Sequence, residues 1–277
     1  MHRVDHELAR ERSSNVTQNP QALYGISDEV VVTADGPVRI VRLNRPDNLN
    51  GANRPMHQSL AKVWDHLSAD DGARAVIVTG AGSTFSAGGD FGYMQENIDD
   101  EAMRAQTIDE GRAIIRGLVR CPLPVIAAVN GPAVGLGCSI AVLCDLVLMS
   151  ENSFLADPHL RMGLVPGDGG MVWPALVGLS RAKEYLFLGS RITPEKAVEF
   201  GLASRVIAPD ELMPEALALA SRLAQVPPAA LQRTKIALNE YLIVQLDGAF
   251  ESALTGELDS MGSAEHRDAV ATARKNA

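Results

Sequence analysis

The chain has 277 residues, with 25 Lys and Arg side chains against 34 Asp and Glu side chains, so its formal net charge is −9. This length suits one large domain or two small ones, with a core that needs no disulfides. The acidic balance, without any basic run, disfavours a nucleic-acid partner or an anionic membrane surface. The three cysteines are an odd number without metal-site spacing, which predicts reduced thiols and a cytoplasmic location.

The N-terminal segment is polar and lacks the apolar stretch of a signal peptide. We therefore predict a flexible tail over residues 1–24. No stretch of the sequence approaches the roughly 18 uninterrupted apolar residues of a membrane helix. The sequence thus predicts no membrane span.

Strand-like and helix-like patterns alternate from residue 30 onward. Val30–Val32 and Val38–Leu43 flank turn residues and predict paired strands. Apolar residues at three- and four-residue steps then predict a helix over 56–67. The alternation continues with strands at 75–78, 125–129 and 146–149 and a helix at 103–119. This order predicts an α/β fold with mostly parallel strands.

The last part of the chain has a different character. Residues 212–223 and 229–246 are helix-like, with no strand pattern between them. We predict an all-helical region after residue 210. Its Ala-rich faces suit packing against the main body or against another subunit.

Two glycine-rich loops each follow a predicted strand. The first spans 85–91 and the second spans 130–137, with a helix predicted from Cys138. Such loops let backbone N–H groups approach a ligand, and a helix N-terminus adds about half a positive charge. Neither loop has a nucleotide-binding motif. The loops therefore predict an oxyanion site, the alternative being that both are simply tight turns.

A set of motifs in one order resembles the enoyl-CoA hydratase/isomerase (crotonase) superfamily over about residues 28 to 240. The motifs are Leu43-Asn44-Arg45-Pro46 with Asn50, Val78-Thr79-Gly80-Ala81-Gly82, Phe85-Ser86-Ala87-Gly88-Gly89-Asp90, Pro124 to Gly131 and Gly163-Leu164-Val165-Pro166-Gly167. The resemblance implies a crotonase-like β-β-α spiral over 25–210. It also implies a C-terminal helical region over 211–277 that serves oligomerisation as a homotrimer or a dimer of trimers.

The resemblance further implies an oxyanion hole for the enolate of an acyl-CoA thioester. By position, its two donors are the backbone N–H groups of Gly89 and Leu136. Two preorganised donors contribute roughly 3–4 kcal/mol each to such a site. No cofactor is implied beyond the coenzyme A of the substrate, and we expect its contacts among Arg45, Asn50, Ala87, Gly89, Asp90, Phe91 and Gly135.

The sequence departs from the family where hydratases carry two glutamates. Those positions fall on Ser139 and His159. Serine titrates far outside the working range, and we interpret Ser139 as a small helix residue beside the pocket. His159, with an ordinary pKa near 6.5, suits proton transfer or water activation. Asp168, nine residues later, is a candidate to orient its ring, the alternative being a turn residue.

The His159 and Asp168 pair resembles the branch of the superfamily that contains 6-oxocamphor hydrolase. That branch cleaves a carbon–carbon bond in a β-diketone without coenzyme A, and its further acidic residue falls on Glu257. The other histidines form no metal-ligand motif, so we predict no metal. Three hypotheses result: an acyl-CoA hydratase or isomerase, a β-diketone hydrolase, and a non-catalytic acyl-CoA binder.

Overall fold

The computed structural model describes residues 24–276. Its main sheet has six strands in the order β1-β2-β3-β4-β6-β8, and a second sheet pairs β5 with β7. The strands are β1 (Val30–Asp35), β2 (Val38–Leu43), β3 (Ala75–Gly80), β4 (Val125–Val129), β5 (Pro132–Val134), β6 (Leu146–Ser150), β7 (Phe154–Ala156) and β8 (Arg205–Ile207). Only β1 and β2 pair antiparallel in the described strands, so the predicted α/β fold with mostly parallel strands is confirmed.

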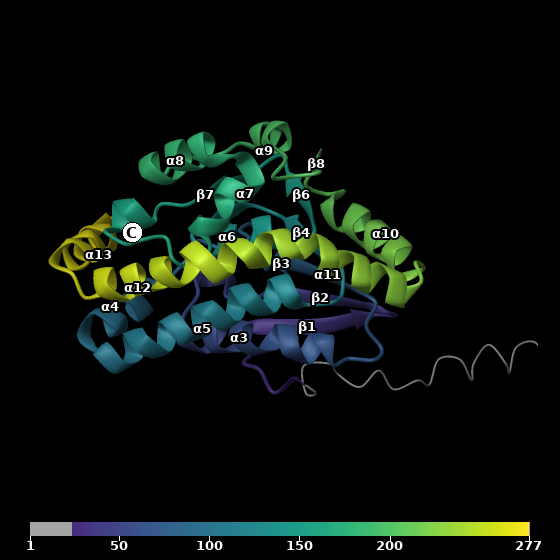
Figure 1. Ribbon diagram of the computed structural model, residues 1–277, viewed down its shortest axis with the longest axis horizontal. Coiled ribbons are helices and arrows are strands. Elements are labelled where there is room, and N and C mark those ends of the chain that lie inside the picture. The colour runs from purple at the N-terminus through teal and green to yellow at the C-terminus, as the bar shows by residue number, and fades with distance from the viewer. Residues whose placement is uncertain (1–23, 277) are drawn as a thin grey trace, which may run out of the picture.

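Helices surround the main sheet (Figure 1). They are α3 (Arg54–Ser68), α4 (Phe91–Asp99), α5 (Glu101–Arg120), α6 (Leu136–Leu143), α7 (Trp173–Val177), α8 (Leu179–Leu188), α9 (Pro194–Phe200), α10 (Leu212–Ala224), α11 (Pro228–Gln245), α12 (Glu251–Met261) and α13 (Ala264–Asn276). Short 3-10 turns are η1 (Pro46–Asn48), η2 (His159–Met162) and η3 (Gly170–Val172), and η4 (Leu246–Phe250) is a π-helical turn. The all-helical end predicted from the sequence is confirmed over the described residues.

The central strands are buried on both faces, which explains their continuous apolar runs. On β3, Val76 and Val78 belong to the large core that includes α3 and α5. Ala75 and Ile77 point to the other face, where they pack with α10. Alternate residues of one strand thus serve two separate cores.

Two features differ from the sequence-based boundaries. Tyr24, the last residue of the predicted tail, is buried, and its hydroxyl donates to Asp70 at 2.7 Å. The remainder of the predicted tail lies outside the described residues. The second glycine-rich loop contains β5, and α6 begins at Leu136 instead of Cys138 because Gly135, with φ +54°, turns the chain directly into the helix.

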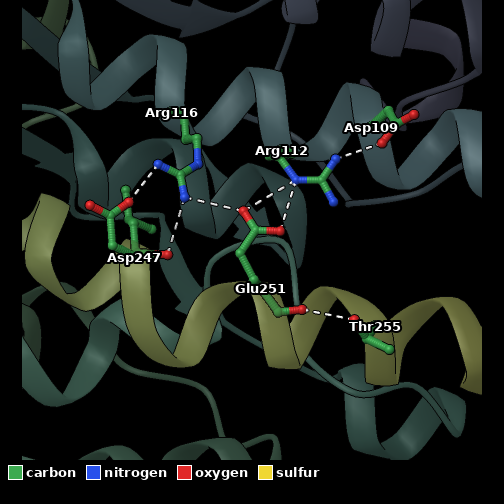
Figure 2. Close-up of polar contacts among 7 residues, drawn as sticks. Asp109, Arg112, Arg116, Asp247, Glu251 and Thr255 are labelled. Atoms are coloured by element: carbon green, nitrogen blue, oxygen red, sulfur yellow. Dashed lines mark hydrogen bonds and ion pairs between the residues drawn. The ribbon is translucent and has the colours of Figure 1, made fainter.

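The C-terminal helices are attached to the main body by charged side chains. Figure 2 shows Glu251, at the start of α12, between two arginines of α5: Arg112 Nε lies 3.0 Å from its carboxylate and Arg116 Nη2 lies 3.1 Å from it. Arg116 also contacts Asp247 at 2.9 Å. These ion pairs position α12, which carries Glu257 further along.

A second attachment is more deeply buried. Lys235 of α11 is 7% exposed, and its Nζ lies 2.7 Å from a carboxylate oxygen of Asp145. The same ammonium donates to the carbonyl of Leu123 at 2.7 Å, and Asp145 accepts the N–H of Val125. Helix α11 is thereby tied to the start of β4.

Candidate active site

One cavity of about 700 Å³ brings together most of the residues singled out from the sequence. This volume is within the usual range for small-molecule sites. Its walls come from the two glycine-rich loops, from η2 and from the C-terminal helices α12 and α13. The C-terminal helices α12 and α13 pack beside α4, from the first half of the chain, at one end of the molecule (Figure 1).

Gly89 and Leu136 both line this cavity. In the described part of the chain, neither backbone N–H has a hydrogen-bond partner. Leu136 is the first residue of α6, where N–H groups have no acceptor within the helix. The first loop approaches the second closely, because a Cβ at Gly88 would lie 3.1 Å from the carbonyl oxygen of Val134. Two residues with unbonded backbone N–H groups, Gly89 and Leu136, therefore line the same cavity.

His159 is held from one side by a carboxylate that we did not single out from the sequence. Its Nδ1 lies 2.5 Å from Oδ1 of Asp157, which also accepts the backbone N–H of His159 at 3.2 Å. On the other side of the ring, Nε2 lies 3.5 Å from Oδ1 of Asp168. Asp157 therefore orients the imidazole ring through Nδ1, a role for which the sequence suggested Asp168.

The missed residue had a local signal. Asp157 precedes His159 by two residues, the spacing at which an Asp side chain accepts a backbone N–H in an Asx turn. Asp168 lies beside Nε2 instead. The sequence placed His159 and Asp168 near each other, but Asp157 holds the Nδ1 side of the ring.

Glu257 completes the group around Nε2. His159, Asp168 and Glu257 each offer an atom within 4.8 Å of the others, and all three line the cavity. Such a set could hold a small cation, an arrangement that the sequence reasoning, which predicted no metal, did not anticipate. Among the described residues, Asp168 Oδ1, Glu257 Oε2 and the hydroxyl of Ser139 are buried without hydrogen-bond partners. Asp168 and Glu257 line the cavity, so their two oxygen atoms can meet a bound molecule, whereas Ser139 is not a lining residue.

The pKa values of Glu257, His159 and Asp168 are all raised, by burial or by neighbouring charges. Burial, reinforced by Asp168, raises the pKa of Glu257 to about 8. Burial alone would lower the pKa of His159, but the negative charges of Asp157 and Asp168 raise it well above its ordinary value. Burial also raises the pKa of Asp168. At neutral pH the group therefore combines an imidazolium with a neutral Glu257.

The expected coenzyme A contacts divide into two sets. Ala87, Gly89, Asp90, Phe91 and Gly135 line the cavity. The other two, Arg45 and Asn50, are not among its lining residues.

Arg45 and Asn50 instead hold the loops together. Arg45 pairs with Asp90 at 2.9 Å and donates to the carbonyl of Gly51. Asn50 is fully buried and its side chain donates to the carbonyls of Ala81 and Thr84. The contact of Arg45 with coenzyme A stays a prediction, and in this structure its charge is paired with Asp90.

A different cation lines the cavity. Arg274, near the end of α13, is the one Lys or Arg among the described lining residues, and it is exposed. Helix α13 packs on α4 and η2. A local positive charge thus exists, contributed by the C-terminal helix.

Comparison with known proteins agrees with the fold. A sequence profile of the enoyl-CoA hydratase/isomerase family matches residues 33–271. The chain is 34% identical over 247 residues to a short-chain-enoyl-CoA hydratase of Clostridium acetobutylicum, covering 88% of this chain and 93% of that protein. The chain therefore belongs to the enoyl-CoA hydratase/isomerase family.

Solved structures show the same fold. An enoyl-CoA hydratase/isomerase from Mycobacterium paratuberculosis is 46% identical, with a TM-score of 0.88 over 90% of this chain and all of that one. A β-diketone hydrolase from Anabaena, solved with (S)-3-oxocyclohexyl acetic acid bound, is 28% identical, with a TM-score of 0.80 over 88% of this chain and 96% of that one. The crotonase fold predicted from the motifs is confirmed.

Proposed function

We propose that the chain adds water to an enoyl-CoA thioester, with the thioester oxygen held by the N–H groups of Gly89 and Leu136. The observation that carries this proposal is that both unpartnered amides line the same cavity as His159. Donors fixed before the reaction stabilise the negative charge that develops on the oxygen as the enolate forms. The relatives named above as enoyl-CoA hydratases support the substrate class.

His159 and Asp168 divide the proton transfers in this proposal. Asp168 takes a proton from water, whose oxygen bonds to the β-carbon of the enoyl group. His159, as the imidazolium, gives its Nε2 proton to the α-carbon. The hydroxyl and the proton together add one water molecule across the double bond. The proton on Asp168 then returns to Nε2 across the 3.5 Å separation. The raised pKa of His159 supports its role as the acid.

Coenzyme A is strongly anionic, so its binding needs a local positive charge in a chain of net charge −9. We propose Arg274 as the residue that meets its phosphates, in place of Arg45. The lining position of Arg274 and the Arg45–Asp90 ion pair support this assignment. Arg274→Ala is expected to raise KM for acyl-CoA substrates while leaving kcat nearly unchanged.

The test of this function is turnover of crotonyl-CoA, followed by loss of the conjugated enoyl absorbance and by mass analysis of the product. We expect hydration by the wild type and a drop in kcat of roughly 10²–10⁴ in His159→Ala. A chain that binds the ester equally well before and after this substitution, without turnover of any ester, would instead be a non-catalytic acyl-CoA binder.

A second function is favoured by the joint position of His159, Asp168 and Glu257 on the cavity. In a β-diketone hydrolase, water attacks one carbonyl, the carbon–carbon bond breaks, and the enolate of the other carbonyl leaves into the oxyanion hole. The likeness to the Anabaena hydrolase supports this alternative. Cleavage of a cyclic β-diketone without turnover of crotonyl-CoA would select it over hydration.

We also propose self-association through α11. Four of its apolar side chains are exposed in the single chain: Ile236, Leu238, Tyr241 and Val244 at 43%, 64%, 78% and 65%. Such a strip suits an interface between subunits. The family resemblance implies a homotrimer or a dimer of trimers, and we propose this assembly.

Among the described residues, no helix has the length and apolarity needed to cross a membrane. The three free, buried cysteines support our proposal of a cytoplasmic location.

A further inference from the structure

A second group of buried polar side chains lines the same cavity and has no part in the chemistry above. It consists of His57 from α3, Tyr93 and Asn97 from α4, and Thr107 from α5. Each is less than 9% exposed. We call these four residues the polar wall.

The hydrogen bonds of the polar wall have fixed directions. Asn97 donates its amide N–H to the backbone carbonyl of Tyr93 at 3.0 Å, so its oxygen faces the hydroxyl of Thr107 at 2.7 Å and must accept from it. The Thr107 hydrogen is then used. The Tyr93 hydroxyl, 2.6 Å from Thr107, must therefore be the donor in that pair. Its oxygen retains lone pairs and can only accept from a further group.

His57 presents a free ring nitrogen to the same space. Its Nδ1 lies 2.9 Å from a carboxylate oxygen of Glu110, which fixes the ring. Its Nε2 has no hydrogen-bond partner in the described part of the chain and is not among the fully buried atoms. The His57 and Tyr93 rings lie 5.8 Å apart between centroids. The two side chains can therefore meet one ligand group.

The polar wall is electrostatically close to the reacting group. The charge of His57 is one of the influences that lower the pKa of Asp168 against the effect of burial. A molecule whose carbonyl lies between the Gly89 and Leu136 amides would extend within the same cavity as the wall. The wall is thus placed to contact a distal part of the substrate.

We propose that the polar wall binds a hydroxyl group on the distal part of the substrate. The hydroxyl donates its single hydrogen to the Tyr93 oxygen, and its own oxygen accepts from His57 Nε2 when that nitrogen carries a proton. This inference rests on the proposed binding of a carbonyl between the two amides. A ketone oxygen would face an acceptor at Tyr93, whereas a hydroxyl can donate to it. A plain alkyl chain would cover these groups without pairing them, which sites built from buried polar groups discriminate against strongly.

The test uses binding alone, so it is independent of turnover. Hydroxy ketones of three lengths (4-hydroxybutan-2-one, 5-hydroxypentan-2-one and 6-hydroxyhexan-2-one) are each compared by NMR titration with the alkan-2-one of equal carbon number. We expect at least one hydroxy ketone to bind the wild type about tenfold more tightly than its alkanone, the usual effect of one satisfied polar group. No preference at any length, or no binding, overturns the proposal.

Variants test whether the polar wall causes the preference for the hydroxy ketone over the alkanone. His57→Gln and Tyr93→Phe are expected to reduce it to less than about threefold, whereas His66→Gln, on the same helix and stacked on Tyr24, is expected to retain it. Far-UV circular dichroism and thermal unfolding identify any variant that fails to fold, and Tyr93→Phe, which removes a single oxygen, remains as the conservative test. A preference that persists in both wall variants overturns the proposal. His159→Ala is expected to keep the preference even where turnover is lost, which separates this inference from the proposed function.

Discussion

Nδ1 of His159 lies 2.5 Å from Oδ1 of Asp157, two residues earlier in the chain, while Nε2 faces Asp168 at 3.5 Å. This arrangement fixes a proton on Nδ1 and leaves Nε2 for the substrate. The side chain of Asp157 is 2% exposed, so its negative charge acts on the imidazole with little screening by water. The nearest carboxylate in sequence thus determines which nitrogen reacts.

Replacement of Asp157 tests this relationship. In Asp157→Asn we expect the pKa of His159 to fall, because the negative charge that contributes most to raising it is lost. The population of imidazolium at neutral pH then falls, and kcat decreases by roughly 10²–10³. NMR titration of the imidazole measures the pKa directly. Asp168→Asn is the matched comparison, and a larger fall in the His159 pKa there would return the orienting role to Asp168.

Glu257 provides a test through stability and pH. Its pKa is raised from 4.5 to about 8 in the folded chain, so between these values the unfolded state releases a proton that the folded state keeps. Rising pH therefore favours unfolding across this window, and below pH 4.5 the effect vanishes. In Glu257→Gln we expect the unfolding free energy to exceed that of the wild type by an amount that grows from pH 5 to pH 8. Glu265→Gln, exposed on α13, is the control, and a pH-independent difference would contradict the assignment.

The buried ion pair of Lys235 and Asp145 is expected to hold α11 on the sheet. Lys235→Met removes the ammonium and leaves the Asp145 carboxylate without its charged partner. We expect a loss of about 2 kcal/mol in the free energy of unfolding, below the value for a fully buried pair because Asp145 is 22% exposed. Chemical denaturation measures this, and Arg205→Met, whose ion pair with Glu215 is 47% exposed on both sides, is expected to lose less than about 1 kcal/mol.

A charged side chain placed among the exposed apolar residues of α11 is expected to weaken self-association of the chain. Leu238→Glu places a carboxylate in an apolar contact, so we expect the assembly mass to fall toward that of a single chain. Sedimentation or light scattering at several concentrations measures it. Leu188→Glu, on α8 and 56% exposed, is the matched control at another surface. An unchanged mass in Leu238→Glu would place the interface elsewhere.

The sequence predicted those helices and strands that show a clear local pattern of apolar residues. The strands 75–78 and 125–129 and the helices around 56–67 and 103–119 appeared where period and β-branched runs placed them. The short β5, β7 and β8 were missed, because three residues are too few to show a period. Their pairing depends on tertiary contact.

The candidate site was predicted in the same uneven way. Motif order placed Gly89, Leu136, His159 and Glu257 at one cavity, although they lie far apart in the sequence. The pairing of Arg45 with Asp90 was not predicted, because it is a contact between residues 45 positions apart that no local pattern reveals. The polar wall was missed for the same reason, since its members come from three helices.

The central claim is that the Gly89 and Leu136 amides hold an enolate whose α-carbon exchanges a proton with His159. The most direct measurement is deuterium uptake at the α-carbon of butyryl-CoA in D₂O, followed by NMR. This saturated ester tests enolate formation separately from water addition: Nε2 of His159 passes its proton to Asp168 and then takes the α-proton of the ester. We expect uptake well above the rate without protein, and a decrease of about 100-fold in His159→Ala. Equal uptake in both proteins, or none above the background, would contradict the account.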